Sequence, residues 1–220
     1  MARRPSTLAP VIDEIRLGDL GEGDAGALEA HESYDGLSYR EADVSGRDLA
    51  GVSFLECEFV ELSANETDLR SASFVDTRIE RLNAPIFSAP RSRFRDVRIS
   101  GSRWGSAELY ETDWQSVHLV DCKLGYLNLR GATLHDVLFT NCTIDELDLG
   151  GATAHRTSFA DTRVGSLDLT RATLTHVDLR GLDLQRLTGL EGLKGATVNT
   201  AQLADLAPLF AAHLGLKHEP

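Results

Sequence analysis

The chain has 220 residues, 42% of them hydrophobic, and a formal net charge of −12 at pH 7. It is long enough to bury a large core, and its negative charge argues against direct binding to nucleic acid or to anionic membranes. It holds no apolar run long enough to span a bilayer, and its three cysteines lack framework spacing, so we expect a cytoplasmic protein.

Residues 1–33 are rich in glycine and acidic residues. The first twenty residues contain Arg3 and Arg4 but no apolar run and no small-residue cleavage site, so they do not resemble a secretion signal. We expect a short helix near Leu8–Ile15 and irregular chain elsewhere in this N-terminal segment.

Residues 34–188 follow a period of five. A large or small apolar residue, here called the centre, recurs at every fifth position from Tyr39 to Leu184, and the residue two before it is uncharged except at Arg47. A period of five fits neither a helix nor a strand. It fits a chain that turns a corner every five residues, with both positions pointing inward. Four corners close a coil of twenty residues, which agrees with the near-repetition of residues 129–148 in residues 149–168.

Units such as Ala172-Thr173-Leu174-Thr175-His176 carry a small–polar–Leu/Phe–x–x pattern. Over residues 35–188 the chain therefore resembles the pentapeptide-repeat proteins. The resemblance implies an all-β fold, a right-handed quadrilateral parallel β-helix, with a short α-helical C-terminal cap. Stacked coils would pair as parallel strands about 4.8 Å apart, and the seven full coils from Leu49 onward would form a rod.

Charge varies from coil to coil. The coil at residues 49–68 has five acidic residues and no Lys or Arg, and these are candidate partner-binding residues: Glu56, Glu58, Glu61, Glu66 and Asp68. The coil at residues 89–108 has a net charge of +3. Its Arg93, Arg98 and Arg103, here called the arginine belt, precede successive centres and should lie on three successive faces. The belt is either a solvated surface paired with nearby carboxylates or a docking site for an acidic partner.

Proline and tryptophan mark one stretch of the repeat. Trp104 and Trp114 occupy centres, so we expect them to fill the core. Pro85 and Pro90 lie just before them, and there we expect the coil to be least regular.

Residues capable of chemistry are present but not assembled into a site. His135 and His155 should stack on one face with His176 nearby, yet no cysteine or carboxylate is placed to complete a tetrahedral metal site, which favours a solvated ladder. Cys122 and Cys142 stack at inward positions and are typical of buried small residues. There is no nucleophile elbow and no phosphate-binding loop. We expect no enzyme activity, no metal and no cofactor.

Residues 189–220 leave the repeat at Gly189. A helix is predicted there, with Asn199 as N-cap, Gln202 completing a capping box and Gly215 as C-cap. Pro208 should split or kink it. Four apolar residues share one helical face: Leu203, Leu206, Phe210 and Leu214. They would cover the last coil, and the resemblance adds a homodimer through this module, because related proteins dimerise in this way.

Two functions remain open. The first is a non-enzymatic protein-interaction scaffold with an unknown partner. The second follows from the resemblance: some pentapeptide-repeat proteins mimic duplex DNA, bind DNA gyrase in its place, and inhibit it or protect it from quinolones. Acidic columns along the rod would favour mimicry, whereas a surface dominated by the arginine belt would favour the scaffold.

Overall fold

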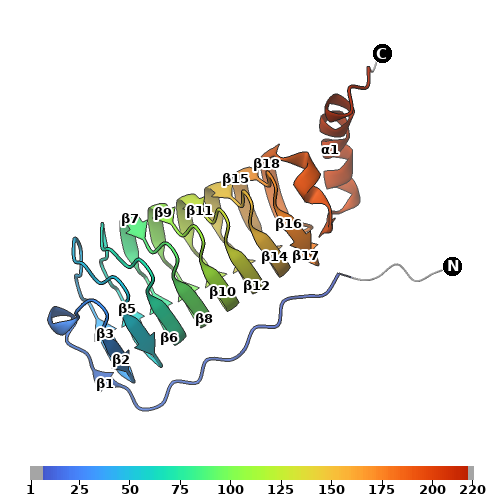
Figure 1. The fold of residues 1–220 in the computed structure, drawn as a ribbon. Helices are drawn as coiled ribbons and strands as arrows, with labels where there is room; N and C mark the ends of the chain where they lie inside the picture. The colour runs from blue at the N-terminus through green and yellow to red at the C-terminus, as the bar shows by residue number, and fades with distance from the viewer. Residues whose placement is uncertain (1–6, 218–220) are drawn as a thin grey trace.

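The computed structural model describes residues 7–217 as a rod of parallel β-coils with one α-helix at its C-terminal end (Figure 1). A first sheet contains β1 (Gly21–Glu22), β2 (Ser33–Asp35), β3 (Leu37–Arg40), β4 (Ser53–Leu55), β5 (Glu58–Val60), β6 (Ser73–Glu80), β8 (Arg93–Ser100), β10 (Asp113–Val120), β12 (Thr133–Thr140), β14 (Thr153–Ala160), β16 (Thr173–Thr175), β17 (Val177–Asp178) and β19 (Ala196–Thr197). A second sheet contains β7 (Asn83–Ser88), β9 (Arg103–Glu108), β11 (Lys123–Asn128), β13 (Thr143–Asp148), β15 (Thr162–Asp168) and β18 (Leu182–Thr188).

The strand register confirms the twenty-residue coil. Trp114 lies beside Phe94 on one side and Leu134 on the other, and the same offset holds from β2 to β18. It changes only at the ends, where Gly21 pairs with Leu37 and Val177 with Ala196. The result is a parallel β-solenoid of about nine turns, which is the predicted fold.

Each coil has four faces, which we number by their centres. The first face carries Phe54 and its twenty-residue successors to Leu174, the second Tyr39 to Leu179, the third Val44 to Leu184, and the fourth Leu49 to Leu169. Long strands such as β6 cover the first and second faces and bend between them at Asp76, whose φ is 48°.

The core consists of the predicted inward residues. Every centre from Tyr39 to Leu179 is buried, and only Leu184, in the last coil, is half-buried. Similar residues stack from coil to coil. The ring centroid of Phe74 lies 5.4 Å from that of Phe54 and 5.0 Å from that of Phe94. Each such side chain contributes roughly 1.5–3 kcal/mol by burial, so the repeat itself stabilises the rod.

The first coils are closed by the one charged residue among the inward small positions. The Arg47 guanidinium donates hydrogen bonds to the backbone carbonyls of Ala25, Gly26 and Leu28. It thereby holds the 3-10 helix η1 (Ala25–Ala27) and buried Leu28 against the open end of the core. This terminal role explains why the repeat pattern is broken at Arg47.

The N-terminal expectation is corrected by the structure. Residues 7–20, here called the strap, form no helix and instead run extended along the rod, beside the first sheet (Figure 1). The reason is that the strap finds hydrogen-bond partners on the rod: the amide of Val11 donates to Asp136 Oδ1 at 2.9 Å, and that of Asp13 to Ser116 Oγ at 2.9 Å. Pro10 also disfavours the helical conformation of the preceding residue, Ala9.

The expected irregularity near the prolines is also wrong. Residues 83–88 form the regular strand β7, in which Ala84 pairs with Trp104 and Ile86 with Ser106. Pro85 lies between these two pairs, at a position that pairs with no residue of β9. Its missing amide therefore interrupts no strand pair. The less regular stretch lies earlier, where the third face is joined only by isolated bridges such as Asp43 to Ser63.

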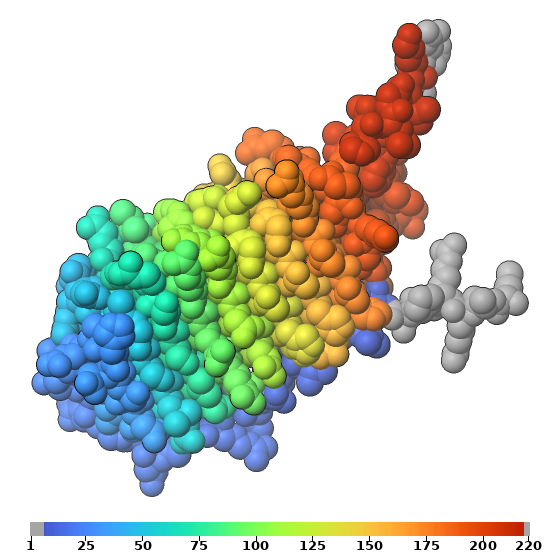
Figure 2. Space-filling model, in the orientation of Figure 1, coloured from blue at the N-terminus to red at the C-terminus, as the bar shows by residue number. Residues whose placement is uncertain are grey.

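The C-terminal region contains a 3-10 helix, η2 (Leu190–Leu193), and α1 (Thr200–His213). The capping box of Asn199 and Gln202 is confirmed. Of the two outcomes predicted at Pro208, a split is wrong, because α1 continues through it, and a kink stays a prediction. The helix ends at His213 with Leu214 as its C-cap, one residue before the predicted C-cap Gly215. Gly215 has a φ of 68°, and its amide donates to Ala212 O at 3.1 Å. In Figures 1 and 2, α1 projects from the end of the rod rather than lying flat across it.

Candidate interaction surfaces

The five acidic candidates are dispersed around their coil. Glu58 lies on the second face, Asp68 on the fourth, and the other three at corners. Three are paired with arginines: Glu58 with Arg40 at 2.5 Å, Glu61 with Arg81 at 2.9 Å, and Asp68 with Arg70 at 2.7 Å. They therefore do not form a single acidic patch.

The arginine belt extends over three faces of the rod. Arg93 in β8 lies 3.7 Å from Asp113, and Arg98, further along β8, has its Nη1 3.0 Å from His118 Nδ1. Arg103 begins β9 on the third face and makes no ion pair with any residue in the described range 7–217. Burial, and then the Arg98 charge, lower the pKa of His118, which favours its neutral form. Within residues 7–217, Arg93 is therefore the belt arginine with an ion pair, whereas Arg98 and Arg103 stay cationic without one.

The fourth face carries a column that sequence analysis missed. One outward residue per coil occupies the same register position from coil to coil: Asp48, Asp68, Ser88, Glu108, Asn128, Asp148 and Asp168. We call this column the acidic ladder. The twenty-residue spacing of its members was visible in the sequence, but charge had been counted by coil and not by column.

The ladder has a structural origin. At most of its rungs an oxygen of the side chain accepts the amide two residues ahead: Asp48 from Ala50, Asp68 from Arg70, Asn128 from Arg130, Asp148 from Gly150 and Asp168 from Thr170, all at 2.8–3.1 Å. Asp and Asn favour this local turn. Cross-coil contacts continue the column, since Asn128 Nδ2 donates to Glu108 Oε2 at 2.6 Å. The turn therefore selects residues that also place negative charge in a line.

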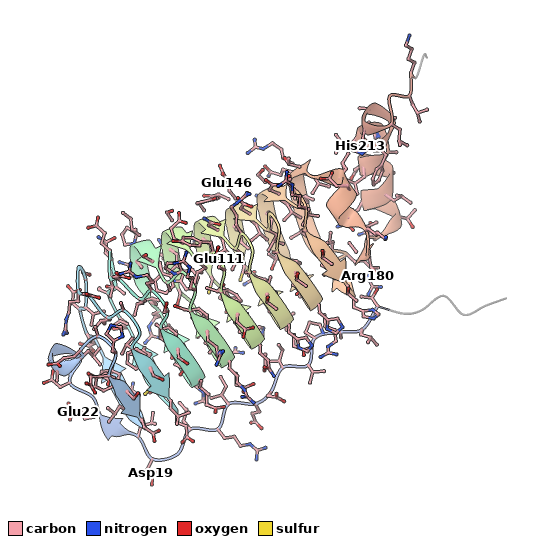
Figure 3. All side chains as sticks on the ribbon, viewed as in Figure 1. Asp19, Glu22, Glu111, Glu146, Arg180 and His213 are labelled. Carbon is pink, nitrogen blue, oxygen red and sulfur yellow. The ribbon has the colours of Figure 1, made fainter. Side chains whose placement is uncertain are left out.

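Two rungs are partly neutralised. Arg70 pairs with Asp68, and Arg130 lies 3.1 Å from Asp148 Oδ2. The hydrogen bond and charge of Asp148 raise the pKa of Arg130 further above its ordinary value. Asp48, Glu108 and Asp168 make no ion pair within the described residues. Charged side chains also emerge elsewhere on the rod, including the labelled Glu111 and Glu146 (Figure 3).

The histidines form a cluster and not a metal site. The rings of His135 and His155 stack 4.8 Å apart, and His176 meets His155 edge-on at 5.8 Å. The nearby carboxylate of Asp136 is engaged by His135 Nδ1 at 2.7 Å and by Arg156 at 2.5 Å. Across residues 7–217 no group of three or more His, Cys, Asp or Glu is placed to hold a metal ion.

The interior leaves little room for a substrate. The space among the N-terminal core residues, including Phe54, Phe59 and Phe74, is about 20 Å³, enough for roughly one water molecule. Cys57, Cys122 and Cys142 are buried and unpaired.

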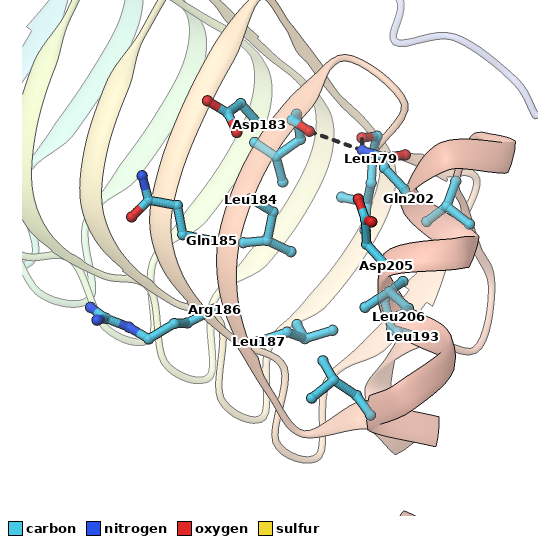
Figure 4. Close-up of a pocket in the computed structure, with 13 residues that line it drawn as sticks. Leu179, Asp183, Leu184, Gln185, Arg186, Leu187, Leu193, Gln202, Asp205 and Leu206 are labelled. Carbon is cyan, nitrogen blue, oxygen red and sulfur yellow. Dashed lines mark hydrogen bonds between the residues drawn. The ribbon is translucent and has the colours of Figure 1, made fainter. Parts of the chain in front are cut away.

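A surface groove lies between the last coil and α1 (Figure 4). Its volume is about 190 Å³, and its apolar lining includes Leu184, Leu187, Leu206 and Leu209. Gln202 Nε2 anchors the helix by donating to Leu179 O at 2.7 Å and Leu182 O at 2.9 Å.

The four predicted cap residues are divided between groove and solvent. Leu206 and Phe210 are half-buried, whereas Leu203 is 54% and Leu214 70% exposed. The helix therefore presents apolar surface that the chain itself does not cover.

Comparisons with known proteins agree with this architecture. Residues 112–188 match the family model described as a pentapeptide repeat region. The solved structure of trypsin-treated QnrB1, a plasmid-mediated fluoroquinolone resistance protein, aligns at a TM-score of 0.50 and 19% identity, covering 90% of this chain and 95% of that one. HetL of the cyanobacterium Nostoc sp. strain PCC 7120 is a pentapeptide repeat protein involved in heterocyst differentiation regulation. It aligns at a TM-score of 0.41 and 17% identity, covering 79% of this chain and 92% of that one.

Two searches gave negative results. No curated protein matches the chain by sequence. Among the helices of residues 7–217, none has the length and apolar character needed to cross a membrane.

Proposed function

Because this chain is a pentapeptide-repeat protein, we propose that it acts without catalysis, as a cytoplasmic rod that binds a protein partner. The acidic ladder supports this proposal most directly. It gives one face of the rod a line of carboxylates over seven coils, without loops that would obstruct a flat or grooved partner. We also propose that the chain is divided into an N-terminal segment (1–33), the repeat rod (34–188) and a C-terminal module (189–220).

The partner that fits the ladder is a protein with a basic groove. From Asp48 to Asp168 the ladder extends over six coil spacings, about 29 Å. Its five carboxylates are fewer than the roughly 17 phosphate charges that duplex DNA carries over the same length. Charge density thus favours a general acidic interaction surface over close mimicry of DNA. The arginine belt, on the other faces, adds a second region at which an acidic part of the partner can dock.

Modulation of DNA gyrase is the second candidate. An acidic column running along most of the rod is the feature that mimicry requires, and QnrB1 is a fluoroquinolone resistance protein with a similar fold. Under this proposal the fourth face would enter the DNA-binding groove of gyrase, inhibiting supercoiling or protecting the enzyme from quinolones.

We also propose that α1 joins two copies of the chain. Leu203 and Leu214 are exposed on a helix that stands away from the rod, and an apolar surface of this kind is typically covered by a partner. Light scattering on the purified protein should give twice the monomer mass. The Leu203→Glu variant should have the mass of a monomer. A monomeric unaltered protein would refute the dimer while leaving the ladder proposal standing.

The ladder is tested with two triple variants of equal charge change. Asp48→Asn with Glu108→Gln and Asp168→Asn, here called the ladder variant, neutralises the three ladder carboxylates that make no ion pair within the described residues. Glu56→Gln with Glu58→Gln and Glu61→Gln neutralises three dispersed carboxylates of one coil. Affinity capture followed by mass spectrometry should recover a partner with the unaltered rod and the second variant, but not with the first. Equal capture by all three proteins would exclude the ladder as the binding surface.

A gyrase supercoiling titration with and without a quinolone separates the two candidates. Inhibition or protection at low micromolar protein, reduced about tenfold by the ladder variant, would establish the gyrase candidate. No effect at tens of micromolar would exclude it for that enzyme, and the scaffold proposal would then rest on the captured partner alone.

A further inference from the structure

The strap lies along the corner between the first and second faces, on the opposite side of the rod from the corner between the third and fourth. One residue per coil occupies this corner, always with a left-handed backbone: Glu56, Asp76, Asp96, Ser116, Asp136, Arg156 and His176. We call them the corner column. Their left-handed φ turns each side chain toward the outside of the bend, where the strap passes.

The rod recognises mainly the backbone of the strap. Val11 N donates to Asp136 Oδ1 and Asp13 N to Ser116 Oγ, so two residues of extended chain pass from one coil to the next. Arg78 Nη2 donates to Ile15 O at 2.6 Å. Bonds of this kind depend on an extended main chain and tolerate different side chains.

The side chains of the strap add little to this attachment. Ile15 is its one buried residue, while Leu8 is 48% and Val11 58% exposed. With so little apolar burial, the strap belongs to the part of the structure that opens without unfolding the rod.

Charge on the strap is poorly matched to the corner beneath it. Asp76 and Asp96 both belong to the corner column, and Asp96 Oδ1 is buried with no hydrogen-bond partner. Burial, then Asp96, raise the pKa of the Asp76 carboxyl, Arg95 opposes this, and Asp13 of the strap adds to the rise. Arg95 lies 3.4 Å from Asp96 Oδ2, so the corner holds two carboxylates against one arginine. A carboxylate at position 13 adds to this excess of negative charge, where a cation would be complementary.

The next strap residue faces a different environment. Glu14 and Ile12 line a hollow of about 270 Å³ together with Arg78, Arg98 and His118. Two arginines border this part of the groove, so a negative side chain suits it, and in this chain the Glu14 carboxylate itself pairs with Arg16 of the strap at 2.9 Å. Arg98, a member of the arginine belt, thus already lies beside the strap.

We infer that the corner column is a binding groove for an extended protein segment, occupied here by the chain's own strap, and that a partner segment with Lys or Arg in place of Asp13 displaces it. Such a segment keeps the main-chain bonds to Asp136 and Ser116. It replaces the repulsion at Asp76 and Asp96 with an ion pair and keeps an acidic residue beside Arg78.

The test uses the full chain and a fluorescein-labelled peptide with the sequence of residues 7–16 and lysine in place of Asp13. Val11→Pro in the chain removes one strap bond by deleting its amide donor and leaves the groove unchanged. Ile12→Pro is the matched control, because the Ile12 amide donates no hydrogen bond within residues 7–217. The peptide, which keeps its own Val11 amide, should bind Val11→Pro at least about fivefold tighter than the unaltered chain, the effect of one hydrogen bond lost from the competing strap. Ile12→Pro should bind it like the unaltered chain.

A second variant tests the charge argument independently of the Val11 amide. Asp13→Lys in the chain should hold its own strap more firmly and weaken peptide binding. Hydrogen exchange should show the Val11 and Asp13 amides exchanging at least about tenfold faster than those of β10 and β12 in the unaltered chain, and slower after Asp13→Lys. Peptide binding unchanged by both substitutions, or strap amides as protected as the strands, would overturn the inference.

Discussion

The fourth face and the corner beneath the strap are built in the same way but presented differently. Each has one polar residue per coil at a spacing of twenty, so each forms a column along the rod. The ladder on the fourth face ranges from the exposed Asp48 through half-buried rungs to the buried Asn128, whereas the corner column is covered lengthwise by the strap. The repeat thus produces columns on every side, and the segments outside the repeat decide which of them a partner meets first.

The two columns also differ in how their charges are balanced. In the ladder, an oxygen of the Asp side chain accepts a local amide, and Asp68 and Asp148 each also pair with one arginine. In the corner column, Asp136 accepts the Val11 amide and pairs with Arg156 and His135. The ladder is therefore suited to long-range attraction, and the corner to short-range recognition of a backbone.

The largest expected effect is a loss of stability in the core that supports both columns. Trp114 is fully buried at the centre two residues before Ser116, and its ring lies 5.4 Å from Phe94. Trp114→Ala should lower the free energy of unfolding by about 3–5 kcal/mol, because the cavity cannot close between stacked coils. Urea denaturation measures this, with the exposed neighbour Gln115→Ala expected within about 0.5 kcal/mol of the unaltered chain. A loss below about 1 kcal/mol would show that the coils adapt around the cavity.

The repeat made most of this core predictable. A centre at every fifth residue identifies its inward positions and the coil length without reference to any structure, and Arg47 stood out because it broke the pattern. The conformation of the strap could not be predicted in this way, since it depends on distant acceptors such as Asp136 and Ser116. The sequence left open whether Pro208 splits or kinks the helix for a related reason, since the local effect of a proline does not decide between the two.

The candidate site was only partly visible for a different reason. Counting charge by coil drew attention to Glu56 and Glu61, which the fold places at separate corners. Counting at intervals of twenty would have aligned Asp48 with Asp148 and Asp168. The register was already known from the sequence, so this part of the surface was predictable in principle, whereas the cover provided by the strap was not.

A smaller effect separates the structural role of the ladder from its charge. Asp148→Ala removes the acceptor of the Gly150 amide, which is buried, and should lower the free energy of unfolding by about 1–2 kcal/mol. Asp148→Asn keeps an acceptor, as Asn128 does one coil earlier, and should change stability by less than about 0.5 kcal/mol. Thermal or urea unfolding of both variants measures the difference. If Asn is as destabilising as Ala, the charge itself and not the turn stabilises this position.

The smallest effect distinguishes the covered side of the rod by its response to pH. Burial first, then Arg156, His135 and His176, lower the pKa of His155 below the ordinary 6.5, with Asp136 opposing, and burial and Arg98 lower that of His118. Because the unfolded chain takes up these protons more readily, the free energy of unfolding should fall as pH decreases below about 6.5, until the folded-state values are passed. Urea unfolding between pH 7.5 and 5.5 should show this slope, and His118→Gln with His155→Gln should reduce it. The ladder variant should retain it, because it leaves both histidines in place. The Asp groups with lowered pKa, such as Asp136 and Asp178, lose their stabilising effect only at more acidic pH, below 3.8, and so do not contribute in this range. A slope that persists in the double histidine variant would place the titrating groups elsewhere on the rod.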